Sequence, residues 1–152
     1  LLTSRGLSWL AGKRVLVTGA GGSIGSEICR TVARSQPARL IAFDQAESNL
    51  FQLAVELPRQ HPDLQLRCEL GSLLSQDRLD EVLRRHRPDV IYHAAAYKHV
   101  PVLEEHPIEA VETNVLGSWF LAQAAAEAGV STFVLISTDK AVFPSSCMGA
   151  TK

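Results

Sequence analysis

The chain has 152 residues, of which 46% are hydrophobic and 20% are charged, and its formal net charge is −1. This length and composition predict a single globular domain with its own core. The near-zero net charge gives no electrostatic reason to expect nucleic acid or an anionic membrane surface as a partner.

Cysteine usage and hydropathy narrow the class of protein further. Three cysteines without a C-x-x-C spacing predict reduced thiols of a cytoplasmic protein, with no metal site. No apolar run approaches the ~18 residues of a membrane span. We expect residues 1–12 to form a lead-in segment and residues 13–152 an NAD(P)-binding Rossmann domain. The chain has no initiator methionine and stops in a helix-like stretch, so we expect it to be cut from a longer protein.

Apolar runs alternate with segments of helical periodicity along the chain. The runs, expected to be strands, lie at 15–17, 40–43, 64–68, 90–92 and 133–136. The first helical stripes are Ile24, Ile28 and Val32; Leu50, Leu53 and Leu57; and Leu79, Val82, Leu83 and His86, with Ser75 as a cap. This alternation predicts an α/β fold, a Rossmann-type doubly wound parallel sheet of order 3-2-1-4-5.

The longest predicted helix begins at Pro107 and ends near Gly129, which suit the first turn and the C-terminal cap of a helix. Its apolar stripe should face the core and consists of Ile108, Val111, Val115, Trp119, Ala122 and Ala126.

A glycine-rich loop joins the first strand directly to a helix. Its glycines, Gly19, Gly22 and Gly25, have the spacing G-x-x-G-x-x-G. Gly19 permits a tight turn, Gly22 leaves room for a pyrophosphate, and Gly25 lets helix and strand pack closely. Ser23 and Ile24 open the helix, whose free N–H groups attract phosphate. The strand–loop–helix context predicts a dinucleotide site rather than a plain turn.

The second strand ends at Asp44. A carboxylate at this point accepts hydrogen bonds from both ribose hydroxyls and repels the extra phosphate of NADP. NAD is therefore the predicted cofactor, with NADP as the alternative. A structural alternative is that Asp44 caps the following helix.

Two more strand ends should border the same crevice. Small residues after the fourth strand would let the cofactor approach the backbone, and a polar segment follows the fifth strand. On the long helix, Asn114 is either a cofactor-site residue or a solvated helix residue. The predicted cofactor-site residues of these strand ends are Ala94, Ala95, Ala96 and Ser137.

Four segments together carry a resemblance to a known family. They are 94–101 (AAAYKHVP), 112–117 (ETNVLG), 137–142 (STDKAV) and 148–152 (MGATK). They resemble the capsular-polysaccharide-type UDP-N-acetylglucosamine 4,6-dehydratases, which are extended short-chain dehydrogenase/reductases. The resemblance covers residues 13–152 and only the cofactor half of such enzymes. It implies a UDP-N-acetylhexosamine substrate, NAD, a homo-oligomeric parent and a role in surface-glycan biosynthesis.

One position sharpens the resemblance. Most of the superfamily has the catalytic pair Tyr-x-x-x-Lys, whereas here Met148 stands in the tyrosine position, four residues before Lys152. The large, membrane-anchored dehydratases of the family resemble this chain in having methionine at the tyrosine position. The resemblance therefore implies a membrane region upstream of Leu1 and a parent protein at the inner face of the bacterial cell membrane. Met148 filling an apolar gap is the structural alternative.

The sequence departs from the family where the adenine is held. The family usually has Gly-Asp after the third strand, and here the pair is Gly71-Ser72. A serine still offers a hydrogen bond to adenine. Lys98 is expected to position substrate or cofactor.

The resemblance also implies the reaction, an internal redox cycle. The sugar is oxidised at C4, water leaves from C5 and C6, and the hydride returns to C6. By resemblance, Asp139 is the acid for the 6-hydroxyl, Lys140 the base at C5, Thr138 a partner of the 4-hydroxyl, and Lys152 a ligand of the nicotinamide ribose. These roles require a raised pKa for Asp139 and a lowered pKa for Lys140.

Competing readings remain open at this point. One is a sugar-nucleotide 4-epimerase or reductase of the same superfamily, and another is a nucleotide-binding module without catalysis. Asp139 and Lys140 are alternatively an exposed turn pair, and His93 and His99 are expected to be structural. We expect the isolated chain to bind dinucleotide weakly or not at all, to turn nothing over, and to expose apolar surface at its last strand.

Overall fold

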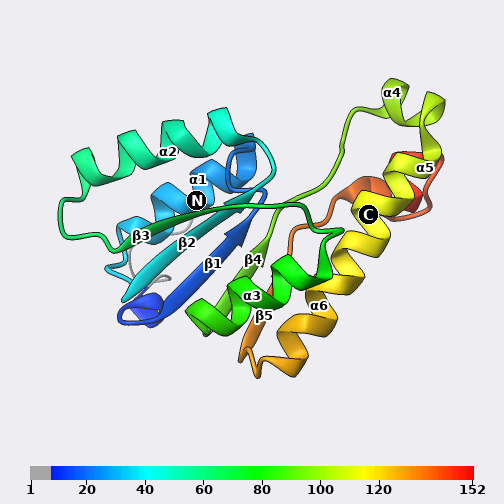
Figure 1. Cartoon of the computed structure of the whole chain (residues 1–152). Helices are drawn as coiled ribbons and strands as arrows, with labels where there is room; N and C mark the ends of the chain where they lie inside the picture. Colours follow the sequence, from blue (N-terminus) through cyan, green and yellow to red (C-terminus); the bar gives the residue numbers. More distant parts are fainter. Residues whose placement is uncertain (1–7) are drawn as a thin grey trace.

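The computed structural model describes residues 8–152 and contains a five-stranded parallel sheet of order β3-β2-β1-β4-β5 (Figure 1). The strands are β1 (Arg14–Thr18), β2 (Arg39–Asp44), β3 (Leu66–Leu70), β4 (Val90–His93) and β5 (Thr132–Leu135). The predicted fold class and strand order are confirmed. β3 begins two residues later than the predicted run at 64–68.

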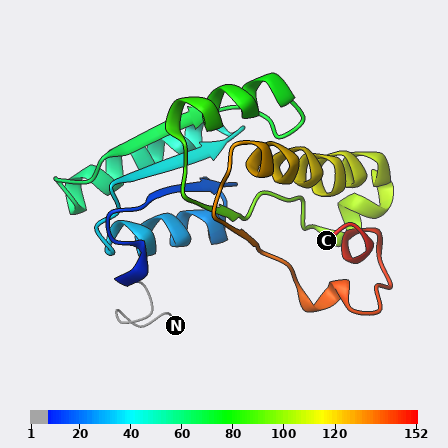
Figure 2. The same ribbon diagram turned by 90° about the horizontal axis from the view of Figure 1, so that it is seen from below.

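Helices cover both faces of the sheet. α1 (Ser23–Ala33) and α2 (Glu47–Gln60) pack on one face, and α3 (Gln76–His86) and α6 (Gly117–Glu127) pack on the other. Figure 2 shows α1 below the sheet and α3 and α6 above it. The sheet has a hydrophobic core on each face. Alternate residues of a strand belong to different cores, because successive side chains of a strand point to opposite faces.

The predicted stripes of α2 and α3 are buried as expected. On α1 the stripe is only partly buried, since Val32 lies in the core but Ile24 is 53% exposed. Cys29 fills the inner face of α1 instead. Ser75 stands at the N-cap of α3, but its side chain makes no capping hydrogen bond.

The prediction for the long helix is right about its ends and wrong about its buried face. It runs through α5 (Pro107–Ala110), a π-helical segment η2 (Val111–Leu116) and α6, and Gly129 follows with φ +70°. Ile108 and Trp119 of the predicted stripe are 71% and 64% exposed. The buried residues are Ala110, Asn114, Gly117, Leu121, Ala124 and Ala125. Small residues let this face approach the rest of the molecule closely: a Cβ on Gly117 would lie 2.9 Å from Cβ of Leu73.

The remaining short elements gather beyond the carboxyl end of the sheet. α4 (Val100–Glu105) packs against α7 (Cys147–Ala150), and the 3-10 turn η3 (Asp139–Ala141) also contacts α7 (Figure 1). Of the predicted lead-in, residues 1–7 lie outside the described residues, and Leu10 is fully buried.

β5 is an edge strand of the sheet and carries exposed apolar side chains. Leu135 is 49% exposed, while Val134 and Ile136 line an open apolar groove beside Ile24 and Ile28 of α1. Apolar surface at the last strand was expected from the sequence, and the structure confirms it. Within residues 8–152, no helix combines the length and hydropathy needed to cross a bilayer.

Candidate functional site

The glycine loop packs against the end of β4 with no space for side chains. Gly19 has φ +66°, and a Cβ there would lie 2.5 Å from the Cα of Ala95. A Cβ on Gly25 would overlap the carbonyl oxygen of Gly19. Gly22 occupies the N-cap of α1, so the first N–H groups of that helix open toward the loop. The loop is therefore closely packed against β4 and leaves the N-terminus of α1 open.

Asp44, at the end of β2, holds the glycine loop in place by hydrogen bonds. Its Oδ2 accepts a hydrogen bond from the N–H of Gly21 at 2.8 Å, and its Oδ1 accepts one from the N–H of Ala46 at 2.9 Å. Asn49 donates its amide to the carbonyl oxygen of Gly21 at 3.1 Å. Ala46 is the N-cap of α2, so Asp44 contacts the residue at the start of that helix, but it does not cap the N–H groups of the first turn. Each carboxylate oxygen keeps a lone pair for a ribose hydroxyl.

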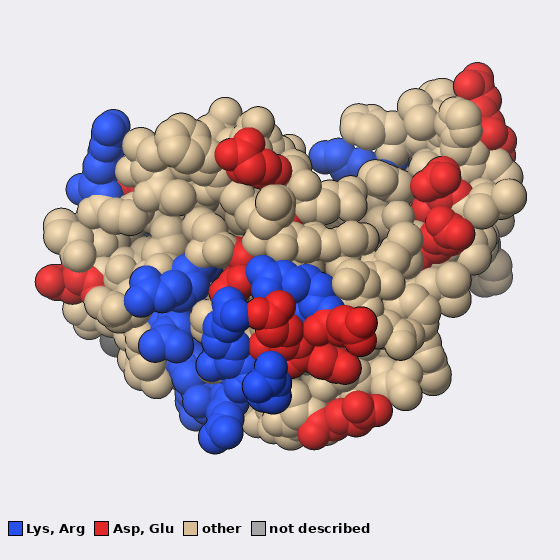
Figure 3. Space-filling view, viewed as in Figure 1, with Lys and Arg blue, Asp and Glu red and all other residues tan. Residues whose placement is uncertain are grey.

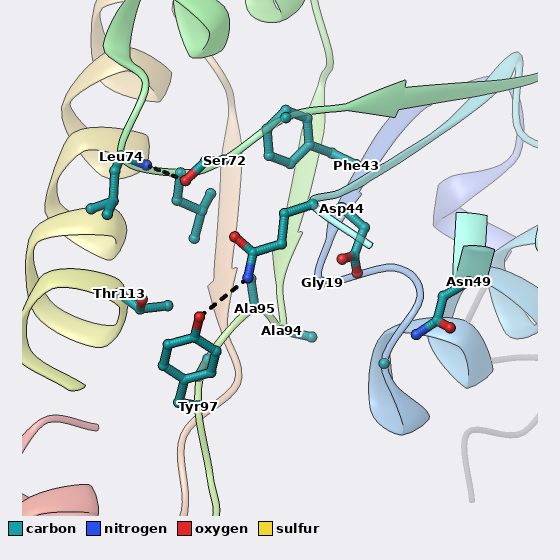
Figure 4. A pocket seen from close by; sticks show the side chains of 15 residues that line it. Gly19, Phe43, Asp44, Asn49, Ser72, Leu74, Ala94, Ala95, Tyr97 and Thr113 are labelled. Atoms are coloured by element: carbon teal, nitrogen blue, oxygen red, sulfur yellow. Dashed lines mark hydrogen bonds between the residues drawn. The ribbon is translucent and has the colours of Figure 1, made fainter. Parts of the chain in front are cut away.

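A cavity of about 200 Å³ opens between the ends of β1, β2, β3 and β4. This is the topological switch point of the sheet, where α/β proteins bind ligands. Figure 4 shows its lining side chains directed toward one space. Eight predicted cofactor residues line it: Gly19, Gly22, Asp44, Gly71, Ser72, Ala94, Ala95 and Ala96. Sequence reasoning missed Phe43, Gln45, Asn49, Leu73, Leu74, Tyr97 and Thr113.

Gly71 and Ser72, which stand where the family usually has Gly-Asp, pack beside Phe43 at the cavity. A Cβ on Gly71 would lie 2.9 Å from the Phe43 ring, so the chain passes directly over that aromatic side chain. The Ser72 hydroxyl lines the cavity and accepts a hydrogen bond from the N–H of Leu74 at 3.2 Å. It retains its proton for donation.

Seven predicted cofactor residues lie outside the cavity lining: Ser23, Ile24, Gly25, Lys98, Asn114, Ser137 and Lys152. Ser23 and Ile24 line the neighbouring apolar groove. Lys98 and Ser137 are exposed.

Tyr97 reaches across the cavity. Gln45, which follows β2, donates its side-chain amide to the Tyr97 hydroxyl oxygen at 3.4 Å (Figure 4). The backbone of Tyr97 is held by Asn114, whose Oδ1 accepts from its N–H at 2.8 Å and whose Nδ2 donates to its carbonyl at 3.1 Å. Asn114 is only 4% exposed and is thus placed beneath the loop as its support.

A chain of polar side chains, all buried except the half-buried Ser118, connects the end of β1 to α7. Thr18 contacts His93 Nδ1 at 2.7 Å, and His93 Nε2 contacts Ser118 Oγ at 2.8 Å. Ser118 donates to the carbonyl oxygen of Asn114, and Asn114 Nδ2 donates to Thr151 Oγ1 at 3.1 Å. We call these five residues the polar chain. It joins β1, β4, η2, α6 and the end of α7.

The polar chain fixes one tautomer of His93. Because the Ser118 proton is donated to Asn114, Nε2 of His93 must donate to Ser118. Nδ1 then accepts from the Thr18 hydroxyl. Burial, with a smaller contribution from the charge of Lys152, lowers the pKa of His93 to about 4, so the ring is neutral. The prediction that His93 is structural fits this position.

The segment after β5 is far more exposed than the cavity. The Asp139 side chain is 90% exposed and lies 3.7 Å from Nζ of Lys140. Thr138 donates its hydroxyl to Asp139 Oδ1 at 2.9 Å. This hydrogen bond and the charge of Lys140 lower the pKa of Asp139. The expected rise in the pKa of Asp139 is therefore wrong for this structure, since nothing buries the carboxylate.

Met148 and Lys152 lie at the two ends of the last helical turn. Met148 is 4% exposed and packs with Leu103 and Ala110, so it does fill an apolar gap. Lys152 donates from Nζ to the carbonyl oxygen of Ile136 at 3.1 Å, and desolvation lowers its pKa. Within residues 8–152, no cluster of three histidine, cysteine or carboxylate side chains is arranged to hold a metal.

Sequence comparison gives relatives among bacterial and archaeal proteins. EpsC of Bacillus subtilis, a probable polysaccharide biosynthesis protein, is 45% identical over 94% of this chain and 24% of its own length. CapD of Staphylococcus aureus, a capsular polysaccharide biosynthesis protein, is 44% identical over the same shares. MJ1061, an uncharacterized membrane protein of Methanocaldococcus jannaschii, is 44% identical over 92% of this chain and 40% of its own length.

Solved structures share the fold. DesIV of Streptomyces venezuelae, a dTDP-glucose 4,6-dehydratase with NAD bound, has a TM-score of 0.78 and 31% identity over 91% of this chain and 48% of its own. A UDP-glucose 4-epimerase of Thermus thermophilus in complex with NAD has a TM-score of 0.75 and 27% identity over 91% and 47%. The chain thus spans less than half of each.

The family model described as "Polysaccharide biosynthesis protein" matches residues 15–152, which include every element of the sheet except the first residue of β1. DesIV and the Thermus thermophilus enzyme, which share the fold of this chain, are a dehydratase and an epimerase of nucleotide sugars. The chain belongs to this polysaccharide biosynthesis family.

Proposed function

We propose that the chain is the cofactor-binding part of an NAD-dependent nucleotide-sugar 4,6-dehydratase. The parent enzyme would convert a UDP-N-acetylhexosamine to its 4-keto-6-deoxy derivative for surface-glycan biosynthesis. The observation that carries this proposal is the buried Met148 in the position of the catalytic tyrosine, with Asp139 and Lys140 at the next strand end beyond the cavity. A methionine cannot accept the proton of a sugar hydroxyl, so the chemistry falls to other side chains.

The cavity fits a dinucleotide on three grounds. The glycine loop leaves space for a pyrophosphate at the N-terminus of α1, where N–H groups are free. Asp44 stands at the end of β2, where a ribose hydroxyl pair would bind. Ser72 and Phe43 line the part of the cavity where the adenine would bind. The carboxylate favours NAD over NADP, since it would repel a 2′-phosphate.

The residues after β5 would supply the acid and base. Bound NAD supplies hydride acceptance and return at the sugar. Asp139 would take the proton of the 4-hydroxyl as C4 is oxidised and would then give it to the departing 6-hydroxyl. Lys140 would take the proton from C5 and later return it there. Thr138 would hold the 4-hydroxyl, and Lys152 the nicotinamide ribose. Asp139 needs a higher pKa than it has here, so the role requires that sugar nucleotide or further protein cover it.

The test uses the longer protein that continues past Lys152. It is incubated with UDP-N-acetylglucosamine, and the product is followed by mass spectrometry without added reductant. Loss of one water with no net NADH is the expected result, and Asp139→Asn should abolish it. Turnover by Asp139→Asn at the wild-type rate would refute the assigned role.

A 4-epimerase is the second candidate, because the Thermus thermophilus epimerase shares this fold at 27% identity. It would give a C4 epimer of unchanged mass in the same assay. For the isolated chain we propose that dinucleotide binding is weak and turnover absent. The exposed side chains of Ile108, Val111, Val115 and Trp119 form an apolar face that would support a homo-oligomer of the parent.

A further inference from the structure

Six arginines gather on one side of the molecule, at the amino ends of the strands and the C-terminal end of α3. Figure 3 shows this blue area at the lower left and centre of the face, with acidic residues at its upper edge and along its right border. We call it the arginine surface. Its members are Arg14, Arg39, Arg67, Arg84, Arg85 and Arg87.

The fold brings these side chains together from four elements. Arg14 pairs with Arg39 across β1 and β2, and Ile41, two residues on, pairs with Arg67 of β3. Ile41 belongs to the core under α3. Because side chains alternate along a strand, Arg14, Arg39 and Arg67 lie on that same face. The last turn of α3 adds Arg84 and Arg85, and Arg87 follows as the C-cap of that helix.

Only part of this positive charge is balanced. Arg14 pairs with Asp89 at 2.7 Å, and Arg85 pairs with Glu69 and Glu81. Within residues 8–152, no ion pair includes the other four members, which are Arg39, Arg67, Arg84 and Arg87. Nε of Arg39 is buried and has no hydrogen-bond partner among these residues. The net charge of −1 therefore conceals a separated charge distribution.

We propose that the arginine surface binds the anionic phosphodiester headgroups of a membrane. A guanidinium presents paired N–H donors that match phosphate oxygens, and it is less strongly hydrated than an ammonium group. The relative MJ1061 is described as a membrane protein and is 44% identical over 92% of this chain. The inference rests on the proposed function, because the family resemblance behind that proposal implies a parent protein at the inner face of a membrane.

The position of the arginine surface favours a broad planar partner. It lies at the amino ends of the strands, whereas the cavity lies at their carboxyl ends. A membrane held there would leave the cavity open to a soluble nucleotide sugar. Residues 10–13, which lead into β1, reach the sheet at this same end. The contact would therefore orient the enzyme without obstructing its site.

The test measures co-sedimentation of the chain with vesicles of about three parts phosphatidylcholine to one part phosphatidylglycerol. Arg67→Gln with Arg84→Gln removes two unpaired members of the surface. The matched control, Arg34→Gln with Arg59→Gln, removes two exposed arginines from the ends of α1 and α2 and gives the same net charge. We expect the first pair to weaken vesicle binding by about 25-fold, or about fivefold per arginine, and the control by less than about twofold.

Other outcomes overturn the proposal. Absence of binding to the anionic vesicles, equal binding to pure phosphatidylcholine, or an equal loss in the control pair would each do so. Tighter binding of a duplex RNA, lost in the Arg67/Arg84 variant, would identify a nucleic acid as the partner instead. The water-loss assay on the longer protein, run without lipid, is expected to be unaffected by the Arg67/Arg84 variant. Failure of the membrane contact is thus separable from failure of the dehydratase proposal.

Discussion

The cavity at the ends of β1 to β4 and the segment after β5 differ in how completely the chain builds them. In the cavity, the glycine loop, Asp44 and Asn49 hold one another by hydrogen bonds and close packing. After β5, Asp139 is 90% exposed, and the nearby hydroxyl and ammonium groups lower its pKa. The fold alone places a side chain at a strand end, but burial decides whether its pKa suits acid–base chemistry.

This contrast predicts that a substitution in the closely packed glycine loop destabilises the chain most and one in the exposed segment after β5 destabilises it least. All of them can be measured by urea unfolding of the same chain. Gly25→Ala should have the largest effect, because the added Cβ overlaps the Gly19 carbonyl. We expect a loss of more than ~3 kcal/mol in the free energy of unfolding.

The control for that variant is Gly129→Ala. Unlike Gly25, Gly129 has a positive φ of +70°, and no atom lies within 4 Å of a Cβ there. Only backbone strain of about 1 kcal/mol is expected. Equal losses in the two variants would show that the loop is not tightly packed.

The second prediction concerns pH and the buried His93. Its pKa is about 4 in the folded chain and close to the usual 6.5 when unfolded. The unfolded state therefore binds the extra proton first, so this stability is complete above about pH 6.5 and is lost as pH falls toward about 4. We expect a loss of about 3 kcal/mol across this window. His93→Asn should remove this part of the pH dependence, and an unchanged profile would contradict the assignment.

Third, His93→Leu at neutral pH should destabilise the chain by about 2 kcal/mol. The substitution leaves the Thr18 and Ser118 hydroxyls without their partner in a buried setting. His93→Asn should recover part of the loss, because its amide oxygen can accept from Thr18. Leucine and asparagine variants of equal stability would argue against the polar chain.

Fourth, Asp44→Asn should cost about 1 kcal/mol. One carboxylate oxygen becomes an amide that cannot accept from a backbone N–H, so the bond to Gly21 or to Ala46 is lost. In the longer protein, the affinity for NAD should fall at least about tenfold. Asp63→Asn, in the loop before β3, serves as the control for removal of one negative charge.

The smallest effect on stability is expected for Asp139→Asn, whose unfolding midpoint should match that of the wild-type chain. The side chain is exposed, and its partners are residues next to it in sequence. In the longer protein the same substitution should reduce water loss from the nucleotide sugar more than about a hundredfold. A stability loss in the isolated chain would mean that this segment is held more firmly than its exposure indicates.

The sequence predicted the parts that depend on local pattern. Apolar runs and the glycine spacing were sufficient for the strand order and for the loop that joins β1 to α1. The stripe on the long helix was misjudged, because Gly117, Ala124 and Ala125 face the rest of the molecule, whereas Trp119 faces solvent. The packed face includes small residues that the apolar pattern did not single out.

A single sequence carries no signal for contacts between residues that are far apart along the chain. The bond of Thr18 to His93 joins residues 75 positions apart, and Asn49 was overlooked although it holds Gly21. The pKa direction of Asp139 was misjudged, because a role inherited by resemblance does not specify the burial that the role requires. Site contacts with a cofactor remain predictions that the variants above address.

The polar chain also constrains how this domain can be recombined with its relatives. A chimera with a junction between β1 and β4 would take Thr18 from one parent and His93 from the other. A junction after α6 would likewise separate Asn114 from Thr151. Hybrids that keep all five residues from one parent should fold. Hybrids that mix them combine hydroxyl and amide groups from two different hydrogen-bond networks and should be less stable.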